Sequence, residues 1–264
     1  MNKKVLFVHD GPIYRDSHNK FYGIHLNDDL RKRYLLLGDE VKFLIRVERI
    51  SDNDLNKYSQ INSKSFDVIA FPNFKSIRLF FKNHKNAKEI IETSVRKHDI
   101  IVCRLPSASG NIALKESLKL GKPVLVEFVA CTFDAYWNYN WKGKLIAHYK
   151  MFEQKRIMKK VPFSLYVTNS FLQNRYPTTG KTIECSNVEL QNINEIDLRN
   201  RLRRIKSKKN TDPFYLGTVG ALNVPYKSQS DVIRAIAKLK REGYNFYYYL
   251  VGQGNPLKLS LIHI

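Results

Sequence analysis

Hydrophobic residues in this chain fall into short continuous runs that alternate with longer segments of helical spacing. Continuous runs predict strands buried on both faces, and the spaced segments predict helices. Strands that alternate with helices are typical of a parallel sheet covered on both sides. The predicted strands are 5–9, 41–45, 66–71, 100–104, 123–129 and 163–167, and the predicted helices are 21–37, 87–96, 109–120, 145–159 and 169–176. Asp10-Gly11-Pro12 predicts a turn after the first strand.

The same pattern restarts after Asp212-Pro213. Strands at 214–219 and 245–251, with a helix at 231–241 between them, predict one βαβ unit. Residues 191–210 carry seven Lys/Arg and two Asp/Glu without glycine or proline, which indicates a basic helix or linker. We therefore expect a Rossmann-like N-terminal domain over 1–190, a basic linker or helix over 191–212, and a second Rossmann-like domain over 213–264. One βαβ unit cannot cover its own sheet, and residues 259–264 lack a cap, so a truncated reading frame is expected.

Composition narrows the class of protein. The chain has 264 residues, of which 43% are hydrophobic and 12% aromatic, and this excludes a disordered tail. No apolar run reaches the ~18 residues that span a bilayer, and the run at 5–8 is too short for a signal peptide. Cys103, Cys131 and Cys185 form no CxxC pair, so neither a disulfide framework nor a metal site is indicated. A cytoplasmic protein without a cofactor is the expectation.

The net charge of +21 requires an explanation. Nucleic acid, an anionic membrane surface and phosphorylated small molecules are the partners that such a charge favours. An AT-rich genome enriches lysine without any functional cause and explains the excess equally well. The sequence contains no recognisable nucleic-acid motif, so a non-catalytic binder of polyanions or nucleic acid, the alternative function, depends on charge alone.

Glycines lie at the end of both strands in the second half. Gly217-Thr218-Val219-Gly220 ends one strand, Gly252-Gln253-Gly254 ends the other, and Lys227 lies in the loop between them. Glycine lets backbone N–H groups approach a phosphate, a helix N-terminus adds partial positive charge, and a lysine neutralises a diphosphate. Ordinary turns with a solvated lysine are the other explanation of this pattern.

Three stretches resemble a known family. The run "GTVGALNVPYKSQSDVIRAIAKLKREGYNFYYYLVGQG" is similar to the start of the donor domain in family-4 glycosyltransferases of the GT-B fold. The runs "CRLPSASGNIALKESLKLGKPVLVEFVACTFDAYWNYNWKGK" and "YVTNSFLQNRYPTTGKTIECSNVEL" resemble the acceptor domain of capsule and exopolysaccharide transferases in that family. The resemblance covers most of residues 1–254.

The resemblance implies a GT-B-like enzyme that transfers a sugar with retention of configuration. The donor would be a nucleoside diphosphate sugar, and the acceptor a surface polysaccharide or a lipid-linked precursor. A hexosyltransferase in the cytoplasm, peripheral at the inner face of the cell membrane, is expected. A sugar-nucleotide epimerase of the same fold is disfavoured by the stretch at 166–190.

The family also implies roles for individual residues. Lys227 corresponds to the lysine that binds the donor diphosphate, and Gly220, Gly252 and Gly254 would admit the nucleotide sugar close to the backbone. Gly11 matches the N-domain loop that faces the donor. Two departures stand out. Ala221 occupies a position where many members have arginine, and the glutamate pair of the family would fall after Ile264, so we expect this chain alone not to catalyse.

Polar residues at strand ends are the candidates in the first domain. Glu127 ends a buried strand and faces the ligand edge by the rule for parallel sheets, as a catalytic or acceptor-orienting carboxylate. A structural pair with Arg104 on a neighbouring strand is the alternative. Asp10 and Arg104 occupy similar strand ends, and Trp137 lies in an aromatic loop at 136–141, so all three are candidates for the acceptor side. Aromatic faces in this loop would pack against sugar rings, and anchoring of the loop to the domain core is the alternative. His9 is a lone histidine, a type that more often serves packing.

A basic amphipathic helix is expected over 145–159. From Lys142 to Lys160 the chain has seven Lys/Arg and one Glu. Leu145, Tyr149 and Phe152 fall on one side of such a helix. This composition fits a helix that rests on anionic lipid, and it fits equally a core-packed helix with a solvated basic face.

Overall fold

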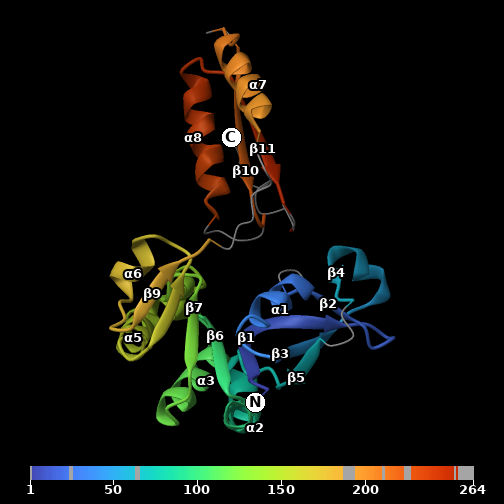
Figure 1. Ribbon diagram of the computed structural model, residues 1–264. Coiled ribbons are helices and arrows are strands. Elements are labelled where there is room, and N and C mark those ends of the chain that lie inside the picture. The colour runs from blue at the N-terminus through green and yellow to red at the C-terminus, as the bar shows by residue number, and fades with distance from the viewer. Residues whose placement is uncertain are drawn as a thin grey trace. The chain divides into compact units, whose positions relative to one another are not determined.

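The computed structural model describes residues 2–23, 26–62, 66–186, 194–209, 212–222, 227–252 and 254. The chain divides into two compact units, Met1–Val188 and Glu189–Ile264, each taken by itself below (Figure 1). The domain boundary expected at residue 190 lies in 187–193, outside the described residues.

Unit 1 is built on a sheet whose main strands are parallel. They run in the order β5(Asp67–Ala70), β3(Glu40–Arg49), β1(Lys4–Arg15), β6(Ile100–Leu105), β7(Val124–Phe128), β8(Phe163–Tyr166) and β9(Lys181–Glu184). The short strands β2(Phe21–Gly23) and β4(Ser59–Gln60) add an antiparallel extension beside β1. The predicted α/β class with a parallel sheet is confirmed.

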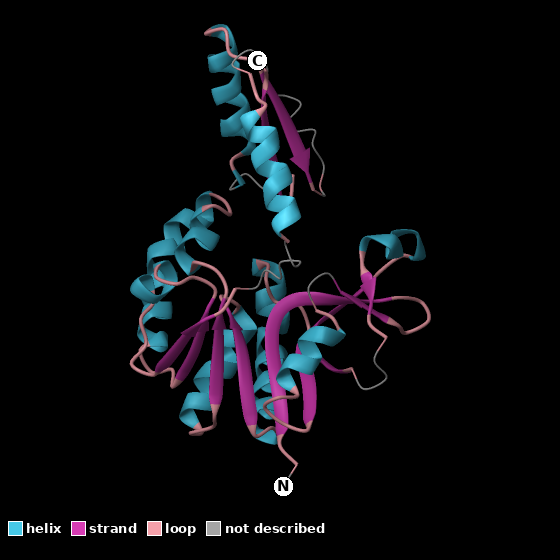
Figure 2. Cartoon of the chain, turned by 45° about the horizontal axis from the view of Figure 1, so that its top comes forward, coloured by secondary structure: helices cyan, strands magenta, loops and turns pink. Residues whose placement is uncertain are grey.

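Helices cover the sheet on both faces (Figure 2). They are α1(Asp28–Tyr34), α2(Ile77–Lys97), α3(Ala108–Lys119), α4(Thr132–Trp137), α5(Trp141–Met158) and α6(Phe171–Arg175), with a 3₁₀ turn at Asp52–Lys57. Alternate residues of β1 divide the core. Leu6 and Val8 face the cluster that contains α2 and α3, whereas Val5 and Phe7 face the cluster that contains α1.

The turn predicted after the first strand is wrong. The turn expected at Asp10-Gly11-Pro12 is part of β1, which continues to Arg15. The pairing with β3 moves from Val8 opposite Leu44 to Pro12 opposite Arg46, so β1 holds extra residues in a bulge, and pairing resumes beyond it.

The helix expected over 21–37 is shorter than predicted. Phe21–Gly23 forms a strand that pairs with Tyr14 and Arg15 of β1. The helix begins only after Asn27, whose side chain accepts a hydrogen bond from the N–H of Leu30 at 3.0 Å. Asparagine is a common residue just before a helix, and the sequence analysis overlooked Asn27 because it relied on the apolar spacing of 21–37.

Half of the aromatic segment 136–141 is helical, so it is not the continuous loop that was expected. Tyr136 and Trp137 end α4, and Trp141 begins α5. Asn140 separates the two helices because its side chain accepts a hydrogen bond from the N–H of Gly143 at 2.8 Å. Trp137 therefore lies on a fixed helix beyond the end of β7.

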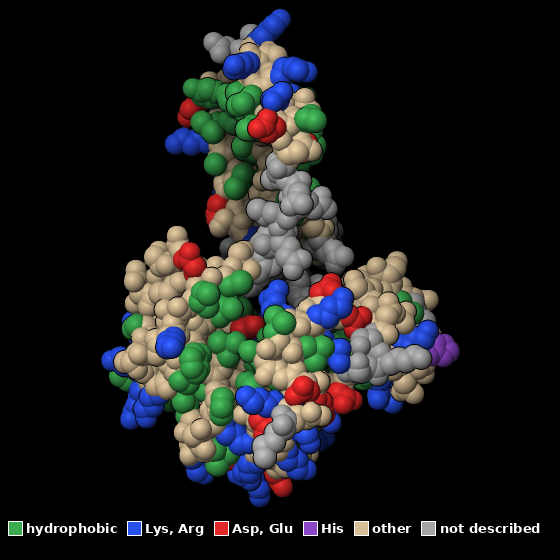
Figure 3. All heavy atoms as spheres, viewed as in Figure 1, with side chains coloured by type: hydrophobic (Ala, Val, Ile, Leu, Met, Phe, Trp, Pro, Cys, Tyr) green, Lys and Arg blue, Asp and Glu red, His purple; other side chains and the backbone are tan. Residues whose placement is uncertain are grey.

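Unit 2 contains α7(Glu195–Lys206), β10(Phe214–Val219), α8(Gln229–Arg241) and β11(Phe246–Val251). β10 and β11 are parallel with α8 between them, which is the predicted βαβ unit. The basic segment is a helix whose start is held by a capping box of Asn194 and Asp197. Apolar side chains gather on one face of unit 2 in Figure 3. Tyr215 of β10 and Tyr247 of β11 are exposed, and their rings stack at 5.3 Å.

Helix α2 offers a test of the core of unit 1. Ile91 is fully buried in the cluster between the sheet and α2, so Ile91→Ala should lower the free energy of unfolding by about 2–5 kcal/mol because it leaves a cavity. Phe81 on the same helix is 84% exposed, and Phe81→Ala should change it by less than about 0.5 kcal/mol. Urea denaturation measures both values. Equal losses in the two variants would contradict this packing of α2.

Candidate functional site

The strand ends of unit 2 come into direct backbone contact. The N–H of Gly220, just after β10, donates to the carbonyl of Val251 in β11 at 2.9 Å. A Cβ on Gly252 would lie 1.9 Å from the carbonyl oxygen of Gly220. Only glycine permits this approach at position 252, whereas a Cβ at position 220 would meet only ordinary contacts.

Lys227 lies against the same glycine. Its side-chain carbons come within 3.6–3.8 Å of the position that a Cβ on Gly220 would take. Ser228 follows with a left-handed φ of 58°, and α8 begins at Gln229. The buried Gln229 side chain donates to the carbonyl of Ala221 at 3.0 Å, which ties the start of α8 to the loop after β10.

The structure thus brings Gly220, Gly252 and Lys227 together beside the N-terminus of α8. Gly254, exposed and with φ of 131°, follows two residues after Gly252. Residues 223–226 and 253 lie outside the described part of the chain. A lysine, glycine backbone and a helix N-terminus at one strand edge form a combination suited to an anion such as a phosphate.

In unit 1, Asp10 holds the start of α3. Its buried carboxylate accepts hydrogen bonds from the N–H groups of Ala108 at 2.7 Å and Ser109 at 2.9 Å, and from the Ser109 hydroxyl. The ammonium of Lys75 lies 3.9 Å from it, and burial lowers the pKa of Lys75. Asp10 therefore fixes the helix that follows β6, and its part in binding an acceptor stays a prediction.

Glu127 lies at the centre of a buried network. Its Oε2 accepts hydrogen bonds from Nε of Arg104 at 2.9 Å, and Arg104 forms an ion pair with the same oxygen. Its Oε1 accepts from the hydroxyl of Tyr34 in α1 at 2.7 Å. The pair with Arg104, one of the two interpretations of the sequence, is confirmed. A catalytic role for Glu127 stays a prediction.

Tyr34 was missed by the sequence analysis because it is 93 residues from Glu127, and no local pattern joins them. The Tyr34 ring stacks on the ring of Phe7, with 5.1 Å between the ring centres. The guanidinium of Arg104 lies 5.1 Å from the centre of the Phe7 ring. Burial, together with the adjacent Glu127 carboxylate, raises the pKa of Tyr34, so the phenol stays a proton donor.

His9 lies in the bulge of β1 beside this network. Its Nδ1 accepts a hydrogen bond from the N–H of Gly11 at 3.0 Å. A side chain at position 11 would come within 2.8 Å of that imidazole, so glycine is required there. Burial and then the charge of Arg104 lower the pKa of His9 from 6.5 to about 4. At neutral pH the ring is uncharged, with its proton on Nε2.

Trp137 is 38% exposed at the end of α4. Its ring stacks on Phe133 at 5.2 Å, and the ammonium of Lys144 lies 5.6 Å from the ring centre. Within the described ranges, no group of three or more His, Cys, Asp or Glu is placed to hold a metal ion.

Comparison with known proteins adds to these observations. No family model matches the chain. Protein CapJ of Staphylococcus aureus is 31% identical over 256 residues, which make up 97% of this chain and 62% of that protein. The chain therefore spans less than two thirds of the length of this relative.

Among solved structures, sucrose-phosphate synthase from Thermosynechococcus elongatus superposes with a TM-score of 0.52 at 12% identity, over 97% of this chain and 64% of that one. MurG from Acinetobacter baumannii gives a TM-score of 0.45 at 12% identity, over 98% and 68% of the two chains. The fold is therefore α/β and Rossmann-like, of the kind found in GT-B glycosyltransferases.

The hydrogen bond from Tyr34 to Glu127 predicts that removal of the Tyr34 hydroxyl lowers the free energy of unfolding. Tyr34→Phe keeps the stacked ring but removes a donor from a buried carboxylate, so it should lower the free energy of unfolding by about 1.5–3 kcal/mol. Tyr139 is 80% exposed, and Tyr139→Phe should leave the value within about 0.5 kcal/mol. Denaturant titration compares them. A Tyr34→Phe protein as stable as the control would mean that Glu127 does not depend on this phenol.

His9 predicts a dependence of stability on pH. An unfolded histidine takes up a proton as the pH falls through 6.5, but folded His9 does so only near 4, so its contribution is complete above 6.5 and is lost as the pH falls toward 4. Asparagine can accept the Gly11 hydrogen bond and does not titrate. Between about pH 8 and about pH 5, wild type should lose ~2 kcal/mol more than His9→Asn. Denaturation at both pH values measures this difference, and equal losses would refute a neutral, buried His9.

Proposed function

We propose that this protein is a glycosyltransferase that moves a hexosyl group from a nucleoside diphosphate sugar, with retention, to a surface polysaccharide or a lipid-linked acceptor. The observation that carries the proposal is the convergence of Gly220, Gly252 and Lys227 at the N-terminus of α8. The resemblance of the sequence to family-4 enzymes and the relative named Protein CapJ support it.

The chemistry needs stabilisation of a leaving diphosphate. The bond from the anomeric carbon to the diphosphate oxygen breaks, and its electron pair stays on that oxygen. The acceptor hydroxyl bonds to the same carbon, and its proton passes to the departing diphosphate oxygen. Lys227 and the backbone beside Gly220 would stabilise the negative charge as it develops. Ala221 supplies no second cation, so Lys227 would carry more of this task than in members with arginine there.

The edge of unit 1 would bind the acceptor through Asp10, Arg104 and Trp137, and Gly11 would face the donor. Arg104 is held in place by Glu127, and Trp137 presents part of an aromatic face. Fixed hydrogen-bonding groups beside an aromatic ring suit a sugar, which has many hydroxyls and apolar C–H faces.

A lipid-linked acceptor would place the enzyme at the inner face of the cell membrane. None of the helices described in the structure is long and apolar enough to cross a bilayer.

The proposal predicts nucleoside diphosphate binding that depends on Lys227. Isothermal titration calorimetry with UDP, GDP and ADP should find saturable binding that favours one base. Lys227→Ala should weaken it about 10–100-fold, since a charged hydrogen bond to phosphate is lost. In an active preparation, turnover should fall about 100–1,000-fold. Lys240→Ala, an exposed lysine in the last turn of α8, is the matched control and should bind normally.

Two results would contradict a nucleoside diphosphate site at Lys227. Equal weakening by Lys227→Ala and Lys240→Ala would reject the diphosphate site. Binding that ignores the base and falls steeply with salt, by several units on a log–log plot, would favour a binder of polyanions.

A further inference from the structure

Helix α5 exposes a row of large apolar side chains. Trp141, Leu145, Tyr149 and Phe152 are 68%, 73%, 65% and 67% exposed. They follow one another at intervals of four, four and three residues, so they share one face of the helix over about three turns. We call these four residues the α5 stripe. Contiguous apolar surface of this kind marks an interaction site rather than ordinary protein surface.

Lysines lie along the rings of this region. The ammonium of Lys142 is 5.5 Å from the ring centre of Trp141, and that of Lys150 is 5.5 Å from Tyr149. Each ammonium therefore lies over the face of an aromatic ring, which is a cation–π arrangement. Lysine, tyrosine and tryptophan side chains each combine an apolar body with a polar end and so suit a boundary between apolar and polar phases.

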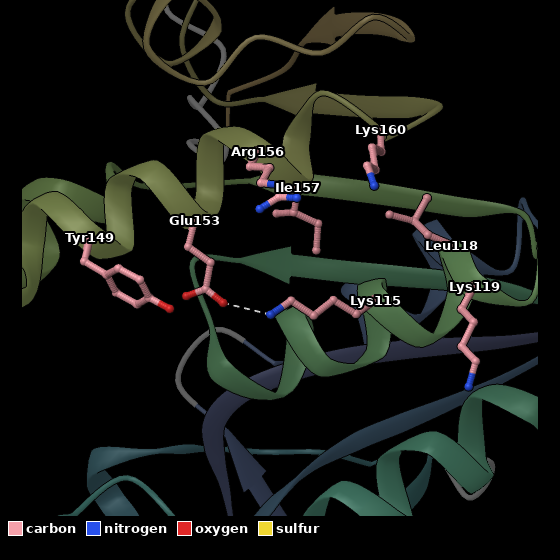
Figure 4. A pocket seen from close by; sticks show the side chains of 8 residues that line it. All are labelled: Lys115, Leu118, Lys119, Tyr149, Glu153, Arg156, Ile157 and Lys160. Atoms are coloured by element: carbon pink, nitrogen blue, oxygen red, sulfur yellow. Dashed lines mark hydrogen bonds and ion pairs between the residues drawn. The ribbon is translucent and has the colours of Figure 1, made fainter.

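The stripe borders a basic cavity. The cavity has a volume of about 580 Å³ and lies between α3 and α5 (Figure 4), where it is lined by Lys115, Leu118, Lys119, Tyr149, Glu153, Arg156, Ile157 and Lys160. Tyr149 belongs to both the stripe and the cavity.

The charges of the cavity are unequal. Four of the lining side chains are cations and one, Glu153, is an anion. Glu153 already accepts hydrogen bonds from Lys115 at 2.8 Å and from Lys150 at 2.8 Å. Lys119, Arg156 and Lys160 therefore leave an excess of positive charge among the residues that line the cavity, which favours an anionic group there.

We propose that the α5 stripe and this cavity form a docking surface for an anionic phospholipid bilayer. The stripe lies among the acyl chains, and the cavity receives the phosphate of a lipid headgroup. The proposal rests on the part of the proposed function that brings the enzyme to a membrane, and it names the surface that does so.

Charge and side-chain type select this occupant over two others. A second copy of the same face would set seven Lys/Arg and one Glu, counted from Lys142 to Lys160, against an identical set, and like charges would repel. A nucleic acid would satisfy the lysines but would leave Leu145 and Phe152 in water. An anionic bilayer matches both parts of the surface because it has a negative surface and an apolar interior.

Vesicle sedimentation of the whole chain tests the proposal. Vesicles of phosphatidylcholine alone are compared with an equal mixture of phosphatidylcholine and phosphatidylglycerol. The chain should sediment with the mixture and stay in solution with phosphatidylcholine. Each basic residue near an anionic surface contributes about fivefold in affinity, so Arg156→Glu with Lys160→Glu should weaken binding about 25-fold or more. Leu145→Ala with Phe152→Ala should weaken it about tenfold or more.

Matched controls come from α2. Ile77 and Phe81 are 67% and 84% exposed, and their double alanine variant removes a similar apolar area. Lys82→Glu with Lys85→Glu, at two exposed positions, makes the same change in charge as the cavity variant. Both controls should bind vesicles as wild type does, and because all these positions are on the surface, every variant should keep its free energy of unfolding within about 1 kcal/mol.

Three results would overturn the proposal. The chain does not sediment with the anionic vesicles, or the α2 variants lose as much binding as the α5 variants. Alternatively, sedimentation equilibrium finds a dimer that Leu145→Ala with Phe152→Ala dissociates while vesicle binding is unchanged, which assigns the stripe to a second copy. No nucleotide is present in this assay, so its failure is separate from a failure of the Lys227 test.

Discussion

Glu127 accepts hydrogen bonds from Arg104 and Tyr34 at a point of the sheet edge that is almost closed to water. A buried carboxylate is costly unless it is paired and hydrogen-bonded, so these partners must be in place whenever unit 1 is folded. They come from β6 and α1, and with β7 they fix three elements relative to one another. Arg104, which Glu127 holds in place, also lies over Phe7, and its charge adds to burial in lowering the pKa of His9.

In unit 2, the arrangement of the two strand ends depends on the close approach of their backbones and not on an ion pair. The carbonyl of Gly220 occupies the space that a side chain at position 252 would need, and Lys227 lies over the other side of that glycine. Each strand is followed by a glycine, which has no side chain. Lys227 and the N-terminus of α8 lie beside these glycines. In each unit, then, the polar groups that suit a ligand gather at the carboxyl ends of parallel strands, where the connections to helices begin.

The sequence predicted the elements whose residues are continuously apolar or regularly spaced, because burial alone determines them. The sequence predicted β10 with the ends that the structure shows. The pair of Arg104 with Glu127 was one of two interpretations of Glu127, and it could be foreseen because neighbouring parallel strands end at the same edge of the sheet. β9, Lys181–Glu184, was missed because it is an exposed edge strand with little apolar character. The bulge in β1 and the contact of Tyr34 with Glu127 depend on residues far apart in the chain, and no local pattern contains that information.

The charge of the molecule is distributed unevenly between its two candidate surfaces. At the sheet edge of unit 1, the ion pairs are Arg46–Glu48, Lys75–Asp10 and Arg104–Glu127, so three cations meet three anions. The segment from Lys142 to Lys160 has seven cations and one anion. The charges named at the edge of unit 1 are paired with one another, whereas the segment from Lys142 to Lys160 contributes +6 to the net charge of +21 and lies beside exposed aromatic rings. Under the proposed function, the local excess of positive charge in 142–160 would serve attachment to an anionic bilayer, and the paired charges at the edge of unit 1 would suit a sugar acceptor.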